Sequence, residues 1–535
     1  MIVLGIEGTA HTVSCGIIDS ERIYSNCSHT IDVESGGIHP RDAALHHSEH
    51  IIPVIREALA KAGLTMKDVD LVAFSMGPGL GPCLRVTATA ARTLALRSDI
   101  PIIGVNHPLG HVEIGRRLTG SRNPIMLYVS GGNTQVIAHI AGRYRVLGET
   151  MDIGLGNLLD KLGRDMGLPF PGGPKIEQYA NLGTTLLDLP YSVKGMDVSF
   201  SGMLTAAKKY ISEGKQLEDI CYSVQEYSFS MLVEVLERAM YQTGKKEILL
   251  AGGVARNQRL RKMLNRFAEE TGAKFLPTDI EYCMDNGAMI AQAGLLMYES
   301  GARQTISETT VNQRFRIDEI DIPWIEDEPV KPEQLKGAES RIIRSDFHGR
   351  SVVLKERIRK HYRNRDLDLA LRNSRARNEI IVMAGIAESG CSVPIIYDFN
   401  PHGPVTTLGM IPGITLAEFL RNNSRELNIS LMRDLGKYIA LFHLKGVSHG
   451  DLTTSNVMVG VKNMPYFIDC SFGKSDSTLN DMAADLFLFR ESLKSLHSDA
   501  GELFSAFYLS YSNNNVNHVK ILEEVEKIES RRRYV

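Results

Sequence analysis

The chain has 535 residues, of which 43% are hydrophobic and 23% charged, with a formal net charge of −3 at pH 7. That length exceeds what one hydrophobic core supports, so we expect two or more globular domains. The 7 cysteines include no C-x-x-C pair, which argues against a disulfide framework or a cysteine-based zinc site. With no secretory signal pattern and no apolar run near the roughly 20 residues of a membrane span, we expect a cytoplasmic protein.

The first part of the chain alternates apolar strands with helices. Residues 1–8 read as a buried strand that ends in a glycine turn, and residues 13–19 as a second strand. Residues 71–96 predict a strand, a glycine loop and a helix, and 124–140 and 246–257 repeat the strand-to-glycine pattern. This order is typical of an α/β protein with a largely buried sheet. Because VLGIEGTAHTVSCGII and MLYVSGGNTQVIAHI share one layout, we also expect an internal duplication.

Four glycine turns follow these strands, at Gly5–Gly8, Gly77–Gly81, Gly131–Gly132 and Gly252–Gly253. A single turn of this kind means little, since glycine also simply makes turns. Several of them in one domain favour a nucleotide cleft, because their exposed backbone N–H groups can hold phosphates.

The segment NHPLGHVEIG, residues 106–115, places His107 and His111 four residues apart. Pro108 suits a first helical turn and disfavours helical geometry in the residue before it. We therefore expect His107 to cap a helix that holds His111 one turn in. Both imidazoles could converge on one metal ion, or they could be an ordinary surface or capping pair. A metalloprotease H-E-x-x-H motif needs glutamate where Pro108 stands, which argues strongly against peptide hydrolysis.

Eight ordered motifs in residues 1–323 resemble the universal tRNA threonylcarbamoyladenosine transferase family, once described as O-sialoglycoproteases, which has the actin/sugar-kinase/Hsp70 fold. They are GIEGTAHT, GPGLGPCLRV, NHPLGHVEIG, YVSGGNTQV, GNLLDKLGRDMGLPFPGGPKIE, FSGMLTA, AGGVARN and CMDNGAMIA. The resemblance implies one Fe or Zn ion, held by His107, His111, Asp285 and Tyr128. It also implies a threonylcarbamoyl adenylate bound by Tyr128, Val129, Ser130, Gly131, Gly132, Asp160, Gly173, Glu177, Gly253 and Asn257.

Several of these residues also have simpler explanations. In isolation Asp160 and Glu177 are ordinary surface acids, and Asp285 could be only a helix N-cap. Two imidazoles with carboxylate and phenolate oxygens do suit Fe or Zn, which would act as a Lewis acid on a carbonyl or phosphate. For Glu7 the family suggests a catalytic or positioning role. In FSGMLTA, Leu204 stands where the family often has lysine, which puts any role of that lysine in question here.

Residues 318–337 hold three prolines and many acids without a helical or strand period, which indicates a linker. We place a metal and nucleotide domain at 1–323, the linker at 324–335 and a second domain at 336–535. Within the second domain, residues 341–377 carry twelve basic and four acidic side chains. This basic run is either a solvated face or a surface that meets the phosphates of nucleic acid.

Residues 448–459, SHGDLTTSNVMV, have the H-x-D-x-x-x-x-N spacing of a protein-kinase catalytic loop. Asp451 would orient the nucleophile and Asn456 would hold a metal ion. The phosphate-pairing lysine, its carboxylate partner and a Mg²⁺ ligand are then expected at Lys355, Glu379 and Asp469. Together these residues predict an ATP and Mg²⁺ site.

Other kinase parts are missing from this domain. LKGAESRIIR offers one glycine in place of G-x-G-x-x-G, Gly450 replaces the catalytic-loop arginine, and no A-P-E segment follows Asp469. Residues 336–535 resemble the small atypical Ser/Thr kinase of the archaeal and eukaryotic KEOPS complex, here fused to its transferase partner.

The two resemblances imply a bifunctional enzyme that transfers a threonylcarbamoyl group to the adenine 3′ of the anticodon in ANN-decoding tRNAs. Its kinase or ATPase domain would support the transfer. Expected partners are tRNA, other KEOPS subunits and a separate threonylcarbamoyl-AMP synthase, with no membrane. The alternatives are a Ser/Thr signalling kinase with a metal-binding regulatory domain, and a non-catalytic tRNA-binding scaffold.

Overall fold

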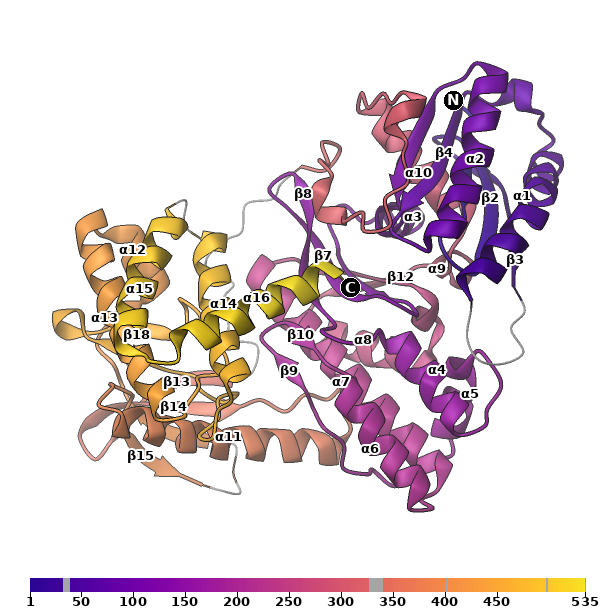
Figure 1. Cartoon of the computed structure of the whole chain (residues 1–535). Helices are drawn as coiled ribbons and strands as arrows, with labels where there is room; N and C mark the ends of the chain where they lie inside the picture. The colour runs from indigo at the N-terminus through magenta and orange to yellow at the C-terminus, as the bar shows by residue number, and fades with distance from the viewer. Residues whose placement is uncertain (32–38, 327–339, 401–402, 404, 497–498, 535) are drawn as a thin grey trace. The chain divides into compact units, whose positions relative to one another are not determined.

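The computed structural model describes residues 1–31, 39–326, 340–400, 403, 405–496 and 499–534. The chain forms two compact units, Met1–Leu335 and Lys336–Val535. The expected linker lies outside the described residues from position 327 onward, as the grey trace in Figure 1 marks.

Two five-stranded sheets with the same topology build the first unit (Figure 1). The strands of the first sheet are β1 (Val3–Glu7), β2 (Thr12–Ile18), β3 (Ile23–Thr30), β4 (Leu71–Gly77) and β5 (Ile102–Asn106). Those of the second are β6 (Ile125–Val129), β7 (Thr134–Ile140), β8 (Arg143–Glu149), β11 (Glu247–Ala251) and β12 (Lys274–Pro277).

The order of the first sheet is β3-β2-β1-β4-β5, and the second repeats it as β8-β7-β6-β11-β12. In each sheet the first three strands pair antiparallel, and the last two join them in parallel. Strands β1, β4, β5 and β6 are buried along their whole length, as their unbroken apolar sequences predict. The α/β class and the internal duplication are both confirmed.

Helices cover both faces of the first sheet. On one face, α1 (Pro40–Ala62) packs on β2 and β3, and α2 (Gly81–Ser98) packs on β4. On the other face α10 (Gly287–Glu299) contacts all five strands. Gly5 permits this approach, because a Cβ there would lie 2.3 Å from backbone atoms of α10. Helix α3 (His107–Thr119) follows β5 directly and touches strands of both sheets.

The second sheet is covered by α7, against which smaller helices pack. Helix α7 is Leu217–Thr243, and the helices that pack against it are α5 (Gly172–Ala180), α6 (Ser201–Ser212) and α8 (Gln258–Thr271). Helix α4 (Leu155–Asp165) packs against α5 and α6, and the short helix α9 (Ile280–Cys283) contacts α3. A short hairpin of β9 (Val193–Lys194) and β10 (Asp197–Val198) lies beside β8.

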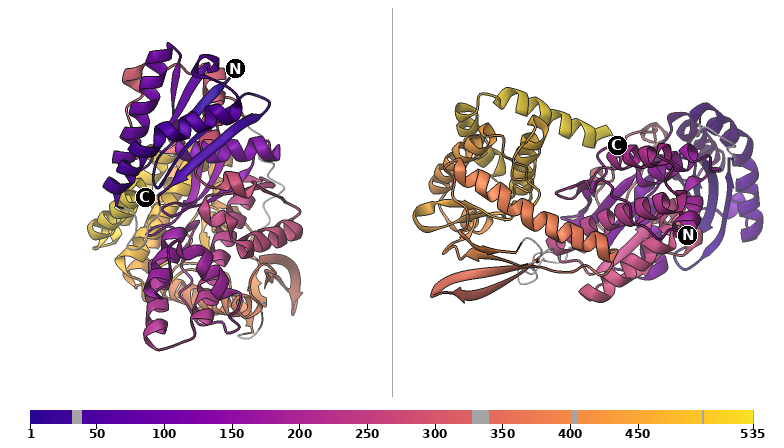
Figure 2. Two further views of the ribbon diagram at one scale, coloured as in Figure 1. Left: turned by 90° about the vertical axis from the view of Figure 1, so that its right-hand side faces the viewer. Right: turned by 90° about the horizontal axis from the view of Figure 1, so that it is seen from below.

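The second unit begins with a four-stranded sheet of order β13-β14-β16-β15, followed by a three-stranded sheet and helices. The strands are β13 (Ser340–Phe347), β14 (Arg350–Arg357), β15 (Ile396–Phe399), β16 (Val405–Gly409), β17 (Ile414–Thr415), β18 (Val457–Val459) and β19 (Pro465–Phe467). The helices are α11 (Arg365–Glu388), α12 (Leu416–Asn422), α13 (Arg425–Leu444), α14 (Leu479–Leu496), α15 (Ala500–Asn514) and α16 (His518–Tyr534). Figure 2 shows α11 as the long helix beside the β13–β14 hairpin.

All seven cysteines are buried and none forms a disulfide. Within the described ranges, no helix is both long enough and apolar enough to cross a membrane.

Candidate functional site

The four predicted metal ligands come together where strands end and helices begin. His107 and His111 lie on the first turns of α3, Tyr128 near the end of β6, and Asp285 just before α10. Nε2 of His107 is 3.4 Å from Oδ1 of Asp285, and Nε2 of His111 is 3.3 Å from the same oxygen. The rings of His111 and Tyr128 have centroids 5.0 Å apart. Two imidazoles, a carboxylate and a neighbouring phenol form a donor set that fits Fe or Zn.

Asparagines, and not the two predicted metal ligands beside them, cap the helices at this site. The Asn106 side chain accepts a backbone hydrogen bond from the first turn of α3, so the expected capping role of His107 is wrong. Asparagine is the stronger cap, and the His107 ring belongs to the cluster instead. Asn286 caps α10 in the same way, which also overturns the N-cap alternative for Asp285.

Glu7 is fully buried at the end of β1, behind His107. Its Oε2 lies 3.0 Å from Nδ1 of His107, and its Oε1 accepts hydrogen bonds from the N–H and hydroxyl of Thr9 at 2.8 and 2.6 Å. His107 thus turns one ring nitrogen toward Glu7 and the other toward Asp285. A carboxylate in this place fixes the tautomer and orientation of a ligating histidine, which favours the positioning role for Glu7.

The buried charges set the protonation of the cluster. Burial lowers the pKa of His107, but Glu7, Tyr128 and Asp285 outweigh it and raise this pKa well above its ordinary value. For His111 burial dominates and lowers the pKa. Burial acts to raise the pKa of Asp285, yet the two histidines hold it well below its usual range. A metal cation would therefore compete with the proton on His107 for a preformed anionic site.

The loop after β6 is firmly held yet open on one side. It contains three of the predicted adenylate contacts, Ser130, Gly131 and Gly132, and a fourth, Val129, is the last residue of β6. Backbone N–H groups at the start of α4 donate to the carbonyl oxygens of Ser130 and Gly131 at 3.1 and 3.0 Å. A Cβ added to Gly132 would meet nothing within 4 Å. The loop can therefore accept a ligand, and it begins two residues after Tyr128.

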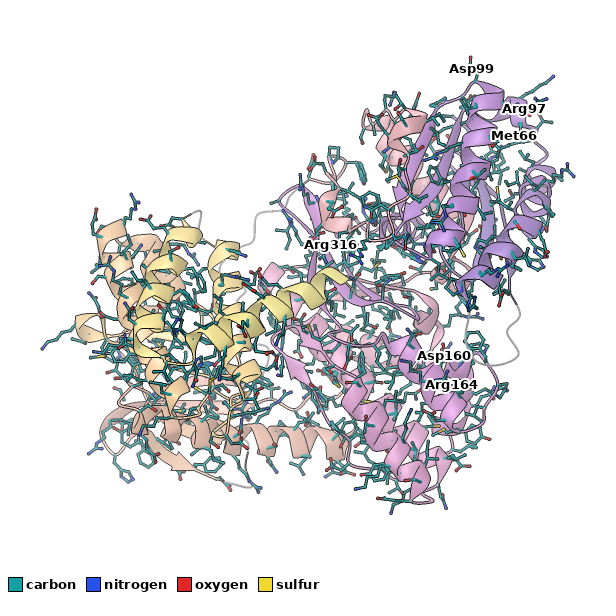
Figure 3. All side chains as sticks on the ribbon, viewed as in Figure 1. Met66, Arg97, Asp99, Asp160, Arg164 and Arg316 are labelled. Atoms are coloured by element: carbon teal, nitrogen blue, oxygen red, sulfur yellow. The ribbon has the colours of Figure 1, made fainter. Side chains whose placement is uncertain are left out.

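Three other predicted adenylate contacts already make hydrogen bonds within the unit. Asp160 on α4 (Figure 3) accepts from the first N–H of α5 at 2.8 Å, beside Gly173, and burial raises the Asp160 pKa. Glu177 on α5 accepts from the first N–H of α8 at 2.7 Å. Asn257 caps α8 with its oxygen and donates its amide to Gln225 at 2.9 Å. Because both polar atoms of Asn257 are engaged, the structure gives it a helix-capping role.

In the second unit, Lys355 on β14 is buried between two carboxylates. Its Nζ lies 2.6 Å from Oε1 of Glu379 on α11 and 2.9 Å from Oδ1 of Asp469. Burial lowers the pKa of Lys355, but Asp469 and Glu379 outweigh it and raise this pKa above its ordinary value. Burial acts to raise the pKa of Asp469, and Lys355 and Arg357 bring it below its usual range. Both groups are therefore charged at neutral pH, as an ATP and Mg²⁺ site requires.

A buried aspartate on α14 holds the predicted catalytic loop. Oδ2 of Asp485 accepts from the backbone N–H of His449 at 2.6 Å, and Oδ1 accepts from Gly450 at 2.7 Å. Asn456 donates to Oδ2 of Asp451 at 3.0 Å, so the two predicted loop residues lie side by side. The loop therefore has the local arrangement that the kinase motif predicts.

The tight packing of the loop explains why the usual arginine is missing. Gly450 has a φ of +81°, and a Cβ there would lie 2.1 Å from the backbone of Phe472. No side chain fits at this position without moving the segment that follows Asp469.

Sequence reasoning missed two residues of this site. Arg357 donates to Oε2 of Glu379 at 2.7 Å, and its two-residue spacing from Lys355 on one strand face could have revealed it. Asp485 carries no local signal, because its role depends on the packing of α14 under the catalytic loop.

The basic run 341–377 does not form one exposed face. Five of its cations are buried: Lys355, Arg357, Lys360, Arg363 and Arg375. Arg363 lies 3.7 Å from the buried carboxylate of Asp368. Exposed members such as Arg344 and Arg359 are the ones that could meet a phosphate backbone.

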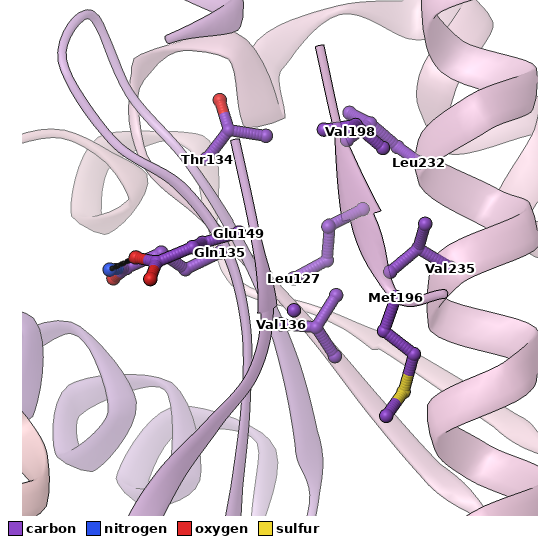
Figure 4. Close-up of a pocket in the computed structure, with 10 residues that line it drawn as sticks. Leu127, Thr134, Gln135, Val136, Glu149, Met196, Val198, Leu232 and Val235 are labelled. Carbon is purple, nitrogen blue, oxygen red and sulfur yellow. Dashed lines mark hydrogen bonds between the residues drawn. The ribbon is translucent and has the colours of Figure 1, made fainter. Parts of the chain in front are cut away.

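A cavity of about 10 Å³ lies between the second sheet and α7 (Figure 4). Apolar side chains line most of it, including Leu127, Val136, Leu232 and Val235. It has room for about one water molecule, so it is a packing void and no substrate site.

Fold and site geometry together define a two-unit protein, with a candidate metal site in the first unit and a kinase-like site in the second. Residues 22–292 match the family described as tRNA N6-adenosine threonylcarbamoyltransferase, and residues 339–488 match the RIO domain. The chain is 55% identical to a bifunctional tRNA threonylcarbamoyladenosine biosynthesis protein of Thermoplasma acidophilum, with full coverage of both chains. It is 53% and 45% identical to relatives of the same name from Thermoplasma volcanium and Methanothermobacter thermautotrophicus, again with full coverage of both chains. The chain belongs to this family of bifunctional tRNA threonylcarbamoyladenosine biosynthesis proteins.

Proposed function

We propose that the first unit transfers the threonylcarbamoyl group of threonylcarbamoyl-AMP to the exocyclic amine of the adenine 3′ of the anticodon in ANN-decoding tRNAs. The observation that carries this proposal is the convergence of His107, His111 and Asp285 beside the strand that leads into the open loop of Gly131 and Gly132. Family membership supports it over the signalling-kinase alternative.

His107, His111 and Asp285, with Tyr128 as an additional ligand, would hold one Fe or Zn ion, which would supply Lewis-acid stabilisation of a phosphate or carbonyl oxygen. Glu7 would keep His107 in the ligating orientation. The backbone of the loop after β6 would hold the adenylate phosphate, and Asp160 and Glu177 would contact its ribose.

The second unit would bind ATP and Mg²⁺ and use their turnover to support the transfer. Lys355 and Asp469 would fix the phosphates and one Mg²⁺, Asn456 would hold metal, and Asp451 would orient the nucleophile. Other KEOPS subunits and a separate synthase of threonylcarbamoyl-AMP would complete the system. The tRNA substrate and the seven unpaired cysteines suit a cytoplasmic location.

Reconstitution tests this function directly. The full-length chain is incubated with an ANN-decoding tRNA, threonine, bicarbonate, ATP, a separate synthase and KEOPS subunits, and the nucleosides are analysed by mass spectrometry. We expect threonylcarbamoyladenosine with the wild type and with His348→Asn, which alters an exposed histidine in the second unit. His111→Ala should give none. Absence of the modified nucleoside with the wild type would overturn the proposal.

A further inference from the structure

Three histidines meet where the edge strand β3 passes α1, apart from the site described above. His29 of β3 and His46 and His50 of α1 place one ring nitrogen each within 4.8 Å of the others. Nδ1 of His29 lies 2.7 Å from Nε2 of His46. The His29 ring stacks on that of His50 with centroids 3.8 Å apart. His46 and His50 are four residues apart on the helix and therefore share one face.

The hydrogen bonds of these rings leave nitrogen lone pairs available. Nδ1 of His50 lies 2.8 Å from the carbonyl oxygen of His46, which can only accept, so Nδ1 holds the proton and Nε2 keeps its lone pair. Metal-binding histidines commonly donate their other N–H to a carbonyl in this way. Between His29 and His46, one facing nitrogen carries the shared proton and the other a lone pair, so the protonated ring must carry its proton on its other nitrogen before both facing nitrogens can bind an ion.

We propose that His29, His46 and His50 form a second metal site, for a divalent transition ion such as Zn²⁺, which joins β3 to α1. Three imidazole nitrogens suit Zn²⁺ and similar ions and do not suit Mg²⁺ or Ca²⁺, which prefer oxygen ligands. Water would occupy the fourth position. Because His29 is exposed, an ion can enter from solvent without opening the core.

Ligation requires two rings to move and one of the hydrogen-bonded imidazoles to change its tautomer. Zinc–nitrogen bonds of about 2.0–2.1 Å put the nitrogens of a tetrahedral site roughly 3.3 Å apart, so His29 and His46 must separate by about half an ångström. His50 stacks on both other rings, with centroids 3.8 Å from that of His29 and 4.4 Å from that of His46. Because stacked rings cannot both point their lone pairs at one ion, the His50 ring must also turn out of the stack. His46 is buried, so the exposed His29 and the half-buried His50 are the rings that move.

Metal counting provides the test. Metal-stripped full-length protein is equilibrated with Zn²⁺, desalted and measured by mass spectrometry. We expect His50→Ala and His29→Ala to hold one ion per chain fewer than the wild type. His348→Asn is the matched control, because it removes an exposed histidine at a position with φ of +52° that asparagine tolerates. It should hold as many ions as the wild type.

A stability measurement separates loss of the site from misfolding. In a His111→Ala background, which removes the other candidate site, Zn²⁺ should raise Tm when the three histidines are intact and should not when His50 is alanine. Without metal the two proteins should have the same circular dichroism and similar Tm. If removal of His29 or His50 leaves the ion count unchanged, or weakens Zn²⁺ binding less than about tenfold, the cluster is a stack of rings and the proposal is overturned.

Discussion

Glu7 shows how a candidate metal site can depend on a residue that need not touch the ion. It is separated from His107 by 100 positions in the chain, yet its carboxylate faces the ring nitrogen that points away from Asp285. The same carboxylate is anchored by Thr9, so its position is set by the turn after β1. The orientation of His107 is thus fixed by a residue of the first sheet, while Asp285 lies just before the start of α10.

We expect Glu7→Gln to lower the affinity of the metal site about 10–100-fold, with a parallel loss of transfer activity. The amide keeps the size of the side chain but removes the charge that raises the His107 pKa, so the ring is held less firmly. Metal content after dialysis against graded chelator measures the change, and Glu21→Gln on the surface is the control. Full metal occupancy and activity in Glu7→Gln would contradict the positioning role.

At the scale of elements, Asp152 joins the end of the second sheet to α6. It accepts hydrogen bonds from the Ser199 hydroxyl and from the backbone N–H groups of Phe200 and Ser201 at 2.9 Å each. Burial acts to raise its pKa, but these hydrogen bonds outweigh burial and lower it. The first two residues of the FSGMLTA motif are therefore held by hydrogen bonds to a charged carboxylate.

These hydrogen bonds to Asp152 predict that the stability of the fold depends on pH. Because the Asp152 pKa is lower in the folded than in the unfolded chain, its contribution is complete above about pH 4 and is lost as the pH falls through the folded value. Asp152→Asn should reduce the free energy of unfolding by about 1–2 kcal/mol at pH 7, and the difference from wild type should shrink toward pH 3. Urea unfolding of both proteins at several pH values gives this difference. A difference that stays constant or grows on acidification would contradict the interpretation.

The elements themselves were largely predictable, and the contacts between them were not. Apolar runs such as those of β1 and β6 must be buried, so strands and their glycine turns follow from sequence pattern. The N-cap of α3 was predicted wrongly. Because Pro108 disfavours helical geometry in the residue before it, His107 was expected to be the cap, but Asn106 is the better capping residue and takes that position. The support that Asp485 gives the catalytic loop is set only when α14 packs, and no local pattern encodes it.

At the scale of the whole molecule, the second unit keeps the parts that bind and cleave ATP. Asp451→Asn should slow ATP turnover about 10²–10⁴-fold by removing the carboxylate that orients the nucleophile. ATP binding should survive, because Lys355 and Asp469 remain. tRNA modification over many turnovers should fall with it, while one round from preformed adenylate should be less affected. The rates of ATP cleavage and of tRNA modification are measured for the variant and for the wild type with saturating tRNA. If the variant no longer cleaves ATP but modifies tRNA over many turnovers at the wild-type rate, the coupling is disproved.

Binding of tRNA should depend on the exposed part of the basic run. We expect the double variant Arg344→Glu, Arg359→Glu to bind tRNA more weakly and with a less steep dependence on salt. The slope of log K against log salt concentration should become shallower by about 0.9 for each phosphate that the variant no longer neutralises. Filter binding of tRNA between low and moderate salt measures the slope. Arg363 is unsuitable for this test because it is buried beside Asp368. An unchanged slope in the double variant would make the run a solvated face.

Because every cysteine is buried, the reaction of each thiol with an added reagent reports when the surrounding part of the chain unfolds locally. Burial raises the pKa of Cys83 to about 11 and that of Cys221 to about 12, so these thiols stay protonated and react slowly at neutral pH. A thiol-reactive dye should leave the native chain almost unlabelled, and each labelled cysteine then marks a segment that has opened. Cys83 at the start of α2 would report on the first unit and Cys470 beside Asp469 on the second. One reagent could thus time the opening of the transferase and kinase units separately, in the same sample and with or without metal or ATP.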